Sequence, residues 1–137
     1  MSNLISEINE ISKSLNYNLI LLSEFEEEEL FDKLKIKFGF DYDNLFIWQS
    51  ITKFKDVEYQ VDEWQEIWSM NLDALNENIY ICISDESYYP WKIYFGSKQT
   101  VLNTICELPF FEYFVFDKEM DKVIFDTHHN FFRIITI

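Results

Sequence analysis

Short apolar segments in the second half of the chain are joined by connections that are too short for a parallel crossover. Residues 79–83 and 91–95 are separated by a segment with the Ser, Asp and Pro residues typical of a turn. Residues 112–116 and 122–125 are separated by a short charged loop. Parallel strands need a connection of about a dozen residues or more, whereas antiparallel strands can be joined by a tight turn. The sequence therefore predicts two hairpins and an antiparallel sheet.

Other segments have the apolar spacing of helices or carry helix-capping residues. Ser23 and Glu26 form the pattern of a capping box, and Gly39 can end the helix that begins there. Ser97 is a second candidate N-cap, and Pro109 stops the helix that follows it. The expected helical segments are residues 4–15, 24–38, 62–75 and 98–108. Further extended segments are expected at residues 19–22, 45–51 and 57–61, and residues 131–137 are apolar enough to dock on the sheet.

Interspersed helices and strands with these connections predict an α+β fold. We expect one globular domain over residues 1–137, with a mainly antiparallel sheet of about five or six strands and helices packed on one face. Hydrophobic residues make up 48% of the chain and aromatic residues 19%, which supplies a core and excludes intrinsic disorder.

The chain is strongly acidic, with 25 Asp and Glu, 11 Lys and Arg, and a formal net charge of −14. This balance excludes electrostatic recognition of nucleic acid and a polybasic membrane-binding surface, because both depend on basic residues. Cys82 and Cys106 lie in apolar runs, which favours buried free thiols and a reducing compartment. With no leader pattern and no apolar stretch of about 18 residues, we expect a cytoplasmic protein.

Few residues carry the marks of catalysis. The two glycines, Gly39 and Gly96, cannot build a Gly-rich phosphate loop or a nucleophile elbow. Adjacent His128 and His129 cannot easily share an ion, because neighbouring side chains of a strand point to opposite faces. Asp126 and His128 could share a face as a metal or general-base pair, or belong to a turn in which one histidine is packed and hydrogen-bonded. We expect no catalytic residue, no metal and no cofactor.

Most of the net negative charge lies in about one quarter of the chain. Residues 56–91 contain nine acidic residues, no Lys or Arg, and three of the four tryptophans. Large amphipathic rings often dominate the binding energy of interfaces, and an uncompensated acidic surface attracts a basic partner. The predicted partner-binding residues are Asp62, Glu63, Trp64, Glu66, Trp68, Asp85, Glu86, Tyr88, Tyr89 and Trp91. The alternative is that the aromatic side chains are core and the carboxylates form its solvated face.

Three stretches within residues 91–133 carry a resemblance: Trp91-Lys92-Ile93-Tyr94-Phe95-Gly96 with the helix after it, Glu112-Tyr113-Phe114-Val115-Phe116-Asp117, and His128-His129. Together with the size, acidity and aromatic content, they resemble small acidic immunity proteins of bacterial toxin systems, a group that includes the SUKH-type immunity domains. The resemblance implies an inhibitor encoded beside a toxin, which protects the producing cell or its kin by binding the toxin tightly.

The leading hypothesis is a non-catalytic immunity or inhibitor protein that neutralises a cognate bacterial toxin, such as a basic nuclease, through an acidic, aromatic-rich face. One alternative is a nucleic-acid-mimicking anti-restriction or anti-defence protein, which would space its carboxylates like phosphates along an elongated face. A second alternative is a small carboxylate-dependent hydrolase, which would need a concave pocket that holds a carboxyl group with a raised pKa.

Overall fold

A computed structural model describes residues 4–14, 19–40, 53–84, 91–108 and 111–136 of the chain. The expected strand at residues 45–51 and the turn at residues 85–90 lie outside these ranges.

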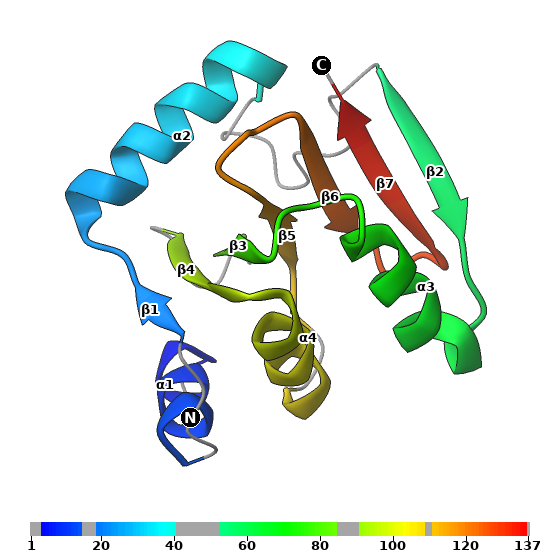
Figure 1. Cartoon of the computed structure of the whole chain (residues 1–137), viewed down its shortest axis with the longest axis horizontal. Helices are drawn as coiled ribbons and strands as arrows, with labels where there is room; N and C mark the ends of the chain where they lie inside the picture. The colour runs from blue at the N-terminus through cyan, green and yellow to red at the C-terminus, as the bar shows by residue number, and fades with distance from the viewer. Residues whose placement is uncertain (1–3, 15–18, 41–52, 85–90, 109–110, 137) are drawn as a thin grey trace.

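The described residues form one antiparallel sheet of seven strands, in the order β1-β4-β3-β5-β6-β7-β2 (Figure 1). The strands are β1 Ile20–Leu21, β2 Phe54–Glu58, β3 Asn78–Ile83, β4 Lys92–Ser97, β5 Tyr113–Phe116, β6 Lys122–Asp126 and β7 Phe131–Thr136. Both predicted hairpins are confirmed, because β3 pairs antiparallel with β4 and β5 pairs antiparallel with β6. The sheet has more strands than expected, since the C-terminal segment is itself a strand that pairs with both β6 and β2.

Four α-helices and one 3-10 turn accompany the sheet in the described parts of the chain: α1 Leu4–Ser14, α2 Glu24–Phe38, η2 Val61–Glu63, α3 Trp64–Leu72 and α4 Lys98–Glu107. The capping box before α2 is present, with the Ser23 hydroxyl accepting from the Glu26 N–H and the Glu26 carboxylate accepting from the Ser23 N–H. Gly39 ends α2 in the left-handed conformation at φ 69°. The Ser97 hydroxyl accepts from the Thr100 N–H at the start of α4. None of these helices is both long and apolar enough to cross a membrane.

Helices cover both faces of the sheet, which corrects the expectation that they pack on one face. Ile8 of α1, Trp68 of α3 and Leu102 of α4 belong to one core cluster. Leu30 and Leu34 of α2 belong to a second cluster, and α2 lies at the upper left of Figure 1, apart from the other helices. The central strands β3 and β5 are apolar at consecutive positions and send side chains into both clusters. A strand that is apolar on both sides needs cover on both sides.

Burial along α2 also differs from the simple helical pattern. The apolar residues of this helix predict a buried side that includes Phe25, but 70% of Phe25 is exposed. Glu27 is buried instead, where its carboxylate accepts from the Ile93 N–H at 2.8 Å and lies 3.7 Å from the Lys92 ammonium. This carboxylate connects α2 to the backbone of β4.

Candidate functional site

A pocket of about 580 Å³ opens between the start of α3, the end of α4 and the turn after β6. Its apolar lining comes from Val61, Ile105, Cys106, Leu108 and Phe111. Its aromatic and polar lining comes from Tyr59, Trp64, Gln65, Tyr113, Asp126, His128 and Asn130. Pockets that combine an apolar lining with a few convergent polar groups are the usual sites of ligand binding.

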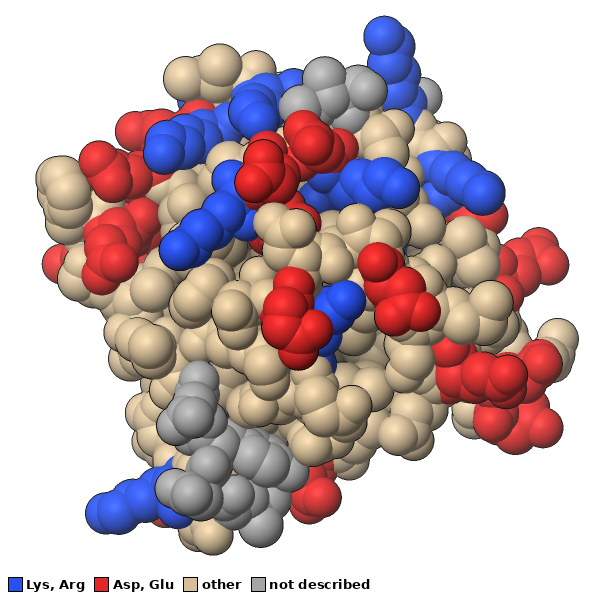
Figure 2. Space-filling model, in the orientation of Figure 1, with Lys and Arg blue, Asp and Glu red and all other residues tan. Residues whose placement is uncertain are grey.

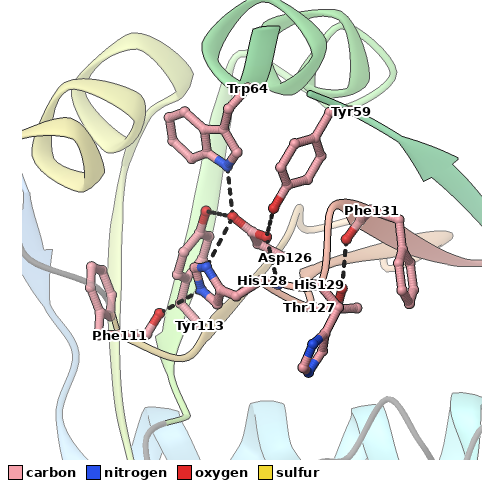
Figure 3. Close-up of polar contacts among 9 residues, drawn as sticks. All are labelled: Tyr59, Trp64, Phe111, Tyr113, Asp126, Thr127, His128, His129 and Phe131. Atoms are coloured by element: carbon pink, nitrogen blue, oxygen red, sulfur yellow. Dashed lines mark hydrogen bonds and ion pairs between the residues drawn. The ribbon is translucent and has the colours of Figure 1, made fainter. Parts of the chain in front are cut away.

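The most buried polar group of this pocket is the carboxylate of Asp126, which has no exposed surface. Its Oδ1 accepts from the Tyr59 hydroxyl at 2.8 Å and from the His128 N–H at 3.0 Å. Its Oδ2 accepts from Trp64 Nε1–H at 2.7 Å and from the Tyr113 hydroxyl at 3.1 Å, as Figure 3 shows. An indole or backbone N–H can only donate, so both oxygens of Asp126 act as acceptors, the role of an ionised carboxylate. Four donors from neutral groups thus surround one buried negative charge.

The sheet topology brings these donors together from distant parts of the sequence. Asp126 is the last residue of β6, and β7 pairs with both β6 and β2, so the end of β2 lies near the end of β6. Tyr59 follows β2 directly, and its N–H donates to the Asn130 carbonyl beyond β6. Trp64 is the first residue of α3, and Tyr113 is the first residue of β5.

Both tyrosine hydroxyls that bind Asp126 remain protonated donors. Burial, followed by the nearby negative charge of Asp126, raises the pKa of Tyr59 and that of Tyr113 well above the ordinary value of 10.0. Their hydrogen bonds to the carboxylate contribute in the same direction. The lone pairs of the two hydroxyl oxygens remain available as acceptors.

His128 lies in a left-handed turn at φ 59° and is packed against Tyr113, with ring centroids 5.9 Å apart. Its Nε2 lies 2.9 Å from the Phe111 carbonyl oxygen, and its Nδ1 lies 3.7 Å from Asp126 Oδ2. The interpretation of this segment as a turn with one packed, hydrogen-bonded histidine is confirmed. Among the residues described, no group of three or more His, Cys, Asp or Glu side chains could hold a metal ion.

The predicted partner-binding residues fall into four groups: the exposed carboxylates, the pocket-lining Trp64, two buried tryptophans, and four residues outside the described ranges. Asp62, Glu63 and Glu66 are exposed on η2 and the first turn of α3, and we call these three residues the acidic rim. Their chain neighbours Val61, Trp64 and Gln65 line the pocket, so the acidic rim belongs to the same segment as part of the pocket wall. Asp85, Glu86, Tyr88 and Tyr89 lie outside the described residues.

Trp68 and Trp91 are core residues, which corrects their prediction as contact residues. Trp68 is fully buried and stacks on Phe132, with ring centroids 5.0 Å apart. Trp91 is buried in the other core cluster, on the opposite face of the sheet. The two indoles therefore cannot share one accessible surface with the acidic rim.

The fold also places basic side chains beside some acidic residues of the stretch 56–91 and not beside others. Asp56 forms a two-point ion pair with Arg133, at 2.9 Å and 3.0 Å. Beyond the end of α3, the Lys98 backbone N–H donates to the Glu77 backbone carbonyl, and the Lys98 ammonium donates to the Leu75 carbonyl. A lysine from α4 therefore lies beside residues 75–77. On the face seen in Figure 2, acidic side chains gather over η2 and the start of α3, at the lower right, with no basic side chain among them.

Asp126 and His128 are candidates from the sequence alone, whereas the aromatic donors around Asp126 are not among the candidates. One feature of the sequence could have indicated these donors. Asp126 ends the apolar run Val123-Ile124-Phe125, and a carboxylate that is buried with such a run must be hydrogen-bonded to nearby donors. Cys82 is buried and free as expected, but Cys106 is free and exposed, at the edge of the pocket.

Comparisons of the chain with protein-family models, with curated proteins and with solved structures found no match.

Proposed function

We propose that this chain is a non-catalytic inhibitor, an immunity protein that binds and neutralises a basic bacterial toxin through the acidic rim and the pocket beside it. The observation that carries the proposal is the position of Asp62, Glu63 and Glu66. They are exposed on the segment whose residues Val61, Trp64 and Gln65 line the pocket, within a 36-residue stretch that contains no Lys or Arg. The resemblance of residues 91–133 to small acidic immunity proteins supports the same function.

Charge at this surface favours fast capture of a cationic protein. A concentrated negative surface can raise association rates by about 10 to 10³-fold, and this gain falls as salt rises. Arg133 pairs with Asp56, and residues 56–91 supply no Lys or Arg to compensate the charge of the acidic rim. Rapid association suits an inhibitor, because binding protects a cell only if it precedes the damage that the toxin does.

Affinity also needs apolar surface that loses water on binding. Val61 is 83% exposed and Met70 is 62% exposed, and both belong to the η2 and α3 segment that carries the acidic rim. The neighbouring pocket adds the half-buried ring of Trp64. This arrangement of an apolar centre with a charged border is typical of protein interfaces.

The pocket chemistry favours binding over hydrolysis. Among the described residues that line it, Asp126 is the one carboxylate, whereas acid–base hydrolysis of the glycosidase type uses a pair. Both Asp126 oxygens are engaged by four donors, so this carboxylate is held as an acceptor in the fold.

Charge reversal at the acidic rim tests the proposal. The triple variant Asp62→Lys, Glu63→Lys, Glu66→Lys should weaken binding to the toxin encoded beside this chain and slow association by about tenfold or more. It should also flatten the dependence of the association rate on ionic strength. The measurement is association kinetics by surface plasmon resonance at several salt concentrations, together with protection of cells that express the toxin.

A matched control separates local charge from net charge. Glu28→Lys, Glu29→Lys, Asp32→Lys makes the same change in net charge on exposed positions of α2. The control should retain most of the association rate and the protection. Equal losses in both variants, or no complex with the wild-type chain, would contradict the proposed function.

A further inference from the structure

The pocket has an electrostatic character that selects among possible occupants. Asp126 gives its lining a formal charge of −1, and no Lys or Arg lines it in the described parts of the chain. The four close donors to Asp126 are neutral dipoles, so they satisfy its oxygens without cancelling its charge. The acidic rim adds three exposed carboxylates on the segment that carries Val61, Trp64 and Gln65 of the pocket wall. An anionic occupant of this pocket is therefore disfavoured, and a cationic occupant is favoured.

The walls add a preference for a flat, weakly hydrated cation. Rings of Tyr59, Trp64, Tyr113 and Phe111 line the cavity, and cations are attracted to the faces of such rings. Asp126 is covered by its donors, as Figure 3 shows, so an occupant would contact the aromatic lining and interact with the carboxylate through space. A guanidinium group stacks on aromatic faces, offers five donors and loses hydration more readily than an ammonium group.

We infer that this pocket receives an arginine side chain of the protein partner, and that this arginine is the central anchor of the complex. The inference rests on the proposed function and names the chemistry by which the partner is recognised. The acidic rim then guides a basic surface toward the pocket, and the guanidinium inserted between the aromatic rings supplies the contact that resists dissociation.

An isolated arginine side chain provides a test that does not need the partner. The probe is N-acetyl-L-arginine N-methylamide, and its matched control is the citrulline analogue, a neutral group of nearly the same shape. Binding is followed by NMR through the Trp64 indole N–H, which donates to Asp126. The titration is made at about pH 8.

We expect the arginine probe to shift the Trp64 indole signal with a Kd of about 1 mM, and the citrulline probe to bind at least about tenfold more weakly. Equal affinity of the two probes would overturn the inference. So would the absence of any shift up to about 100 mM, far above the expected Kd.

A variant that fills the pocket mouth extends the test to the partner. Cys106 is exposed and lines the pocket, so Cys106→Trp should obstruct the mouth, while Cys106→Ser should leave it open. Modification of wild-type Cys106 with N-ethylmaleimide obstructs the mouth without a mutation, since Cys82 is fully buried. Both obstructed forms should lose binding of the arginine probe and at least about tenfold of the affinity for the toxin.

The outcomes distinguish this inference from the function on which it rests. Toxin affinity that is unchanged in both obstructed forms, but lost on charge reversal of the acidic rim, would overturn the arginine anchor and leave the inhibitor function in place. Arginine binding by a chain that forms no complex with the toxin would contradict the inhibitor function and leave the pocket chemistry in place.

Discussion

Replacement of Asp126 by Asn should destabilise the fold, although it removes a buried charge. The amide offers one acceptor oxygen and one donor NH2 group, whereas Asp126 accepts from a donor-only N–H on each of its two oxygens. If the amide oxygen faces the His128 N–H, the NH2 group faces Trp64 Nε1–H, which then has no acceptor. In the reverse orientation the His128 N–H has no acceptor. One partly buried N–H is therefore left without an acceptor in either orientation.

The size of the loss follows from this geometry. A buried donor that is left without an acceptor costs about 1–3 kcal/mol. Each hydrogen bond that persists is weakened by about 1 kcal/mol when its acceptor is no longer charged. Relief from the desolvated charge opposes these terms, since burying a carboxylate is itself unfavourable. We expect a net loss of about 2–4 kcal/mol in the free energy of unfolding, a large part of the total for a domain of this size.

Urea unfolding followed by circular dichroism measures this loss, with the exposed Asp62→Asn as a control that should stay within about 0.5 kcal/mol of wild type. A double-mutant cycle with Tyr59→Phe adds a second check. Tyr59→Phe should cost less in the Asp126→Asn background than in wild type, because the acceptor of its hydroxyl is then neutral. A loss under about 1 kcal/mol for Asp126→Asn would refute the argument that donor-only partners dominate over charge desolvation.

Three further measurements address the core, the thiols and a buried carboxyl group. Trp68→Ala should lower the free energy of unfolding by about 3–5 kcal/mol, because the indole is fully buried and stacked on Phe132, and a loss under about 1 kcal/mol in urea unfolding would argue against a core role. Native protein should expose one thiol to Ellman's reagent, Cys106, and denatured protein two, because burial hides Cys82 and raises its pKa; two reactive thiols in the native state would contradict the structure. Burial raises the pKa of Glu27 above its ordinary value of 4.5, so the folded chain binds this proton more tightly than the unfolded chain, and the stability contributed by Glu27 falls as pH rises through its folded pKa. The stability of Glu27→Gln relative to wild type should therefore grow from about pH 5 to about pH 7 in paired urea titrations, and a constant difference would contradict this direction.

Sequence patterns predicted local features of the fold well. Ser23, Gly39 and Ser97 cap their helices as expected, because a cap depends on hydrogen bonds to residues three or four positions away. Short connections also identified both antiparallel hairpins, since only antiparallel strands can be joined over so few residues.

The accessibility of individual large side chains was less predictable. Trp64, Trp68 and Trp91 all belong to the acidic stretch of residues 56–91, yet the first lines a pocket and the other two belong to separate core clusters. Phe25 is exposed although its side chain is large and apolar, and Cys106 is exposed although it lies in an apolar run. Burial depends on which element packs over a side chain, and that element is remote in the chain.

The order of residues in the sequence determined the helices and strands, the antiparallel pairing of the hairpins and the strongly negative stretch 56–91. The tertiary structure decided which carboxylates of that segment remain uncompensated, that helices cover both faces of the sheet, and that Asp126 lies among aromatic donors. Tyr59 and Trp64 reach this carboxylate across sequence separations of 67 and 62 residues. Capping and periodicity act within a few residues, whereas burial and charge compensation arise between segments that meet only when the sheet has formed.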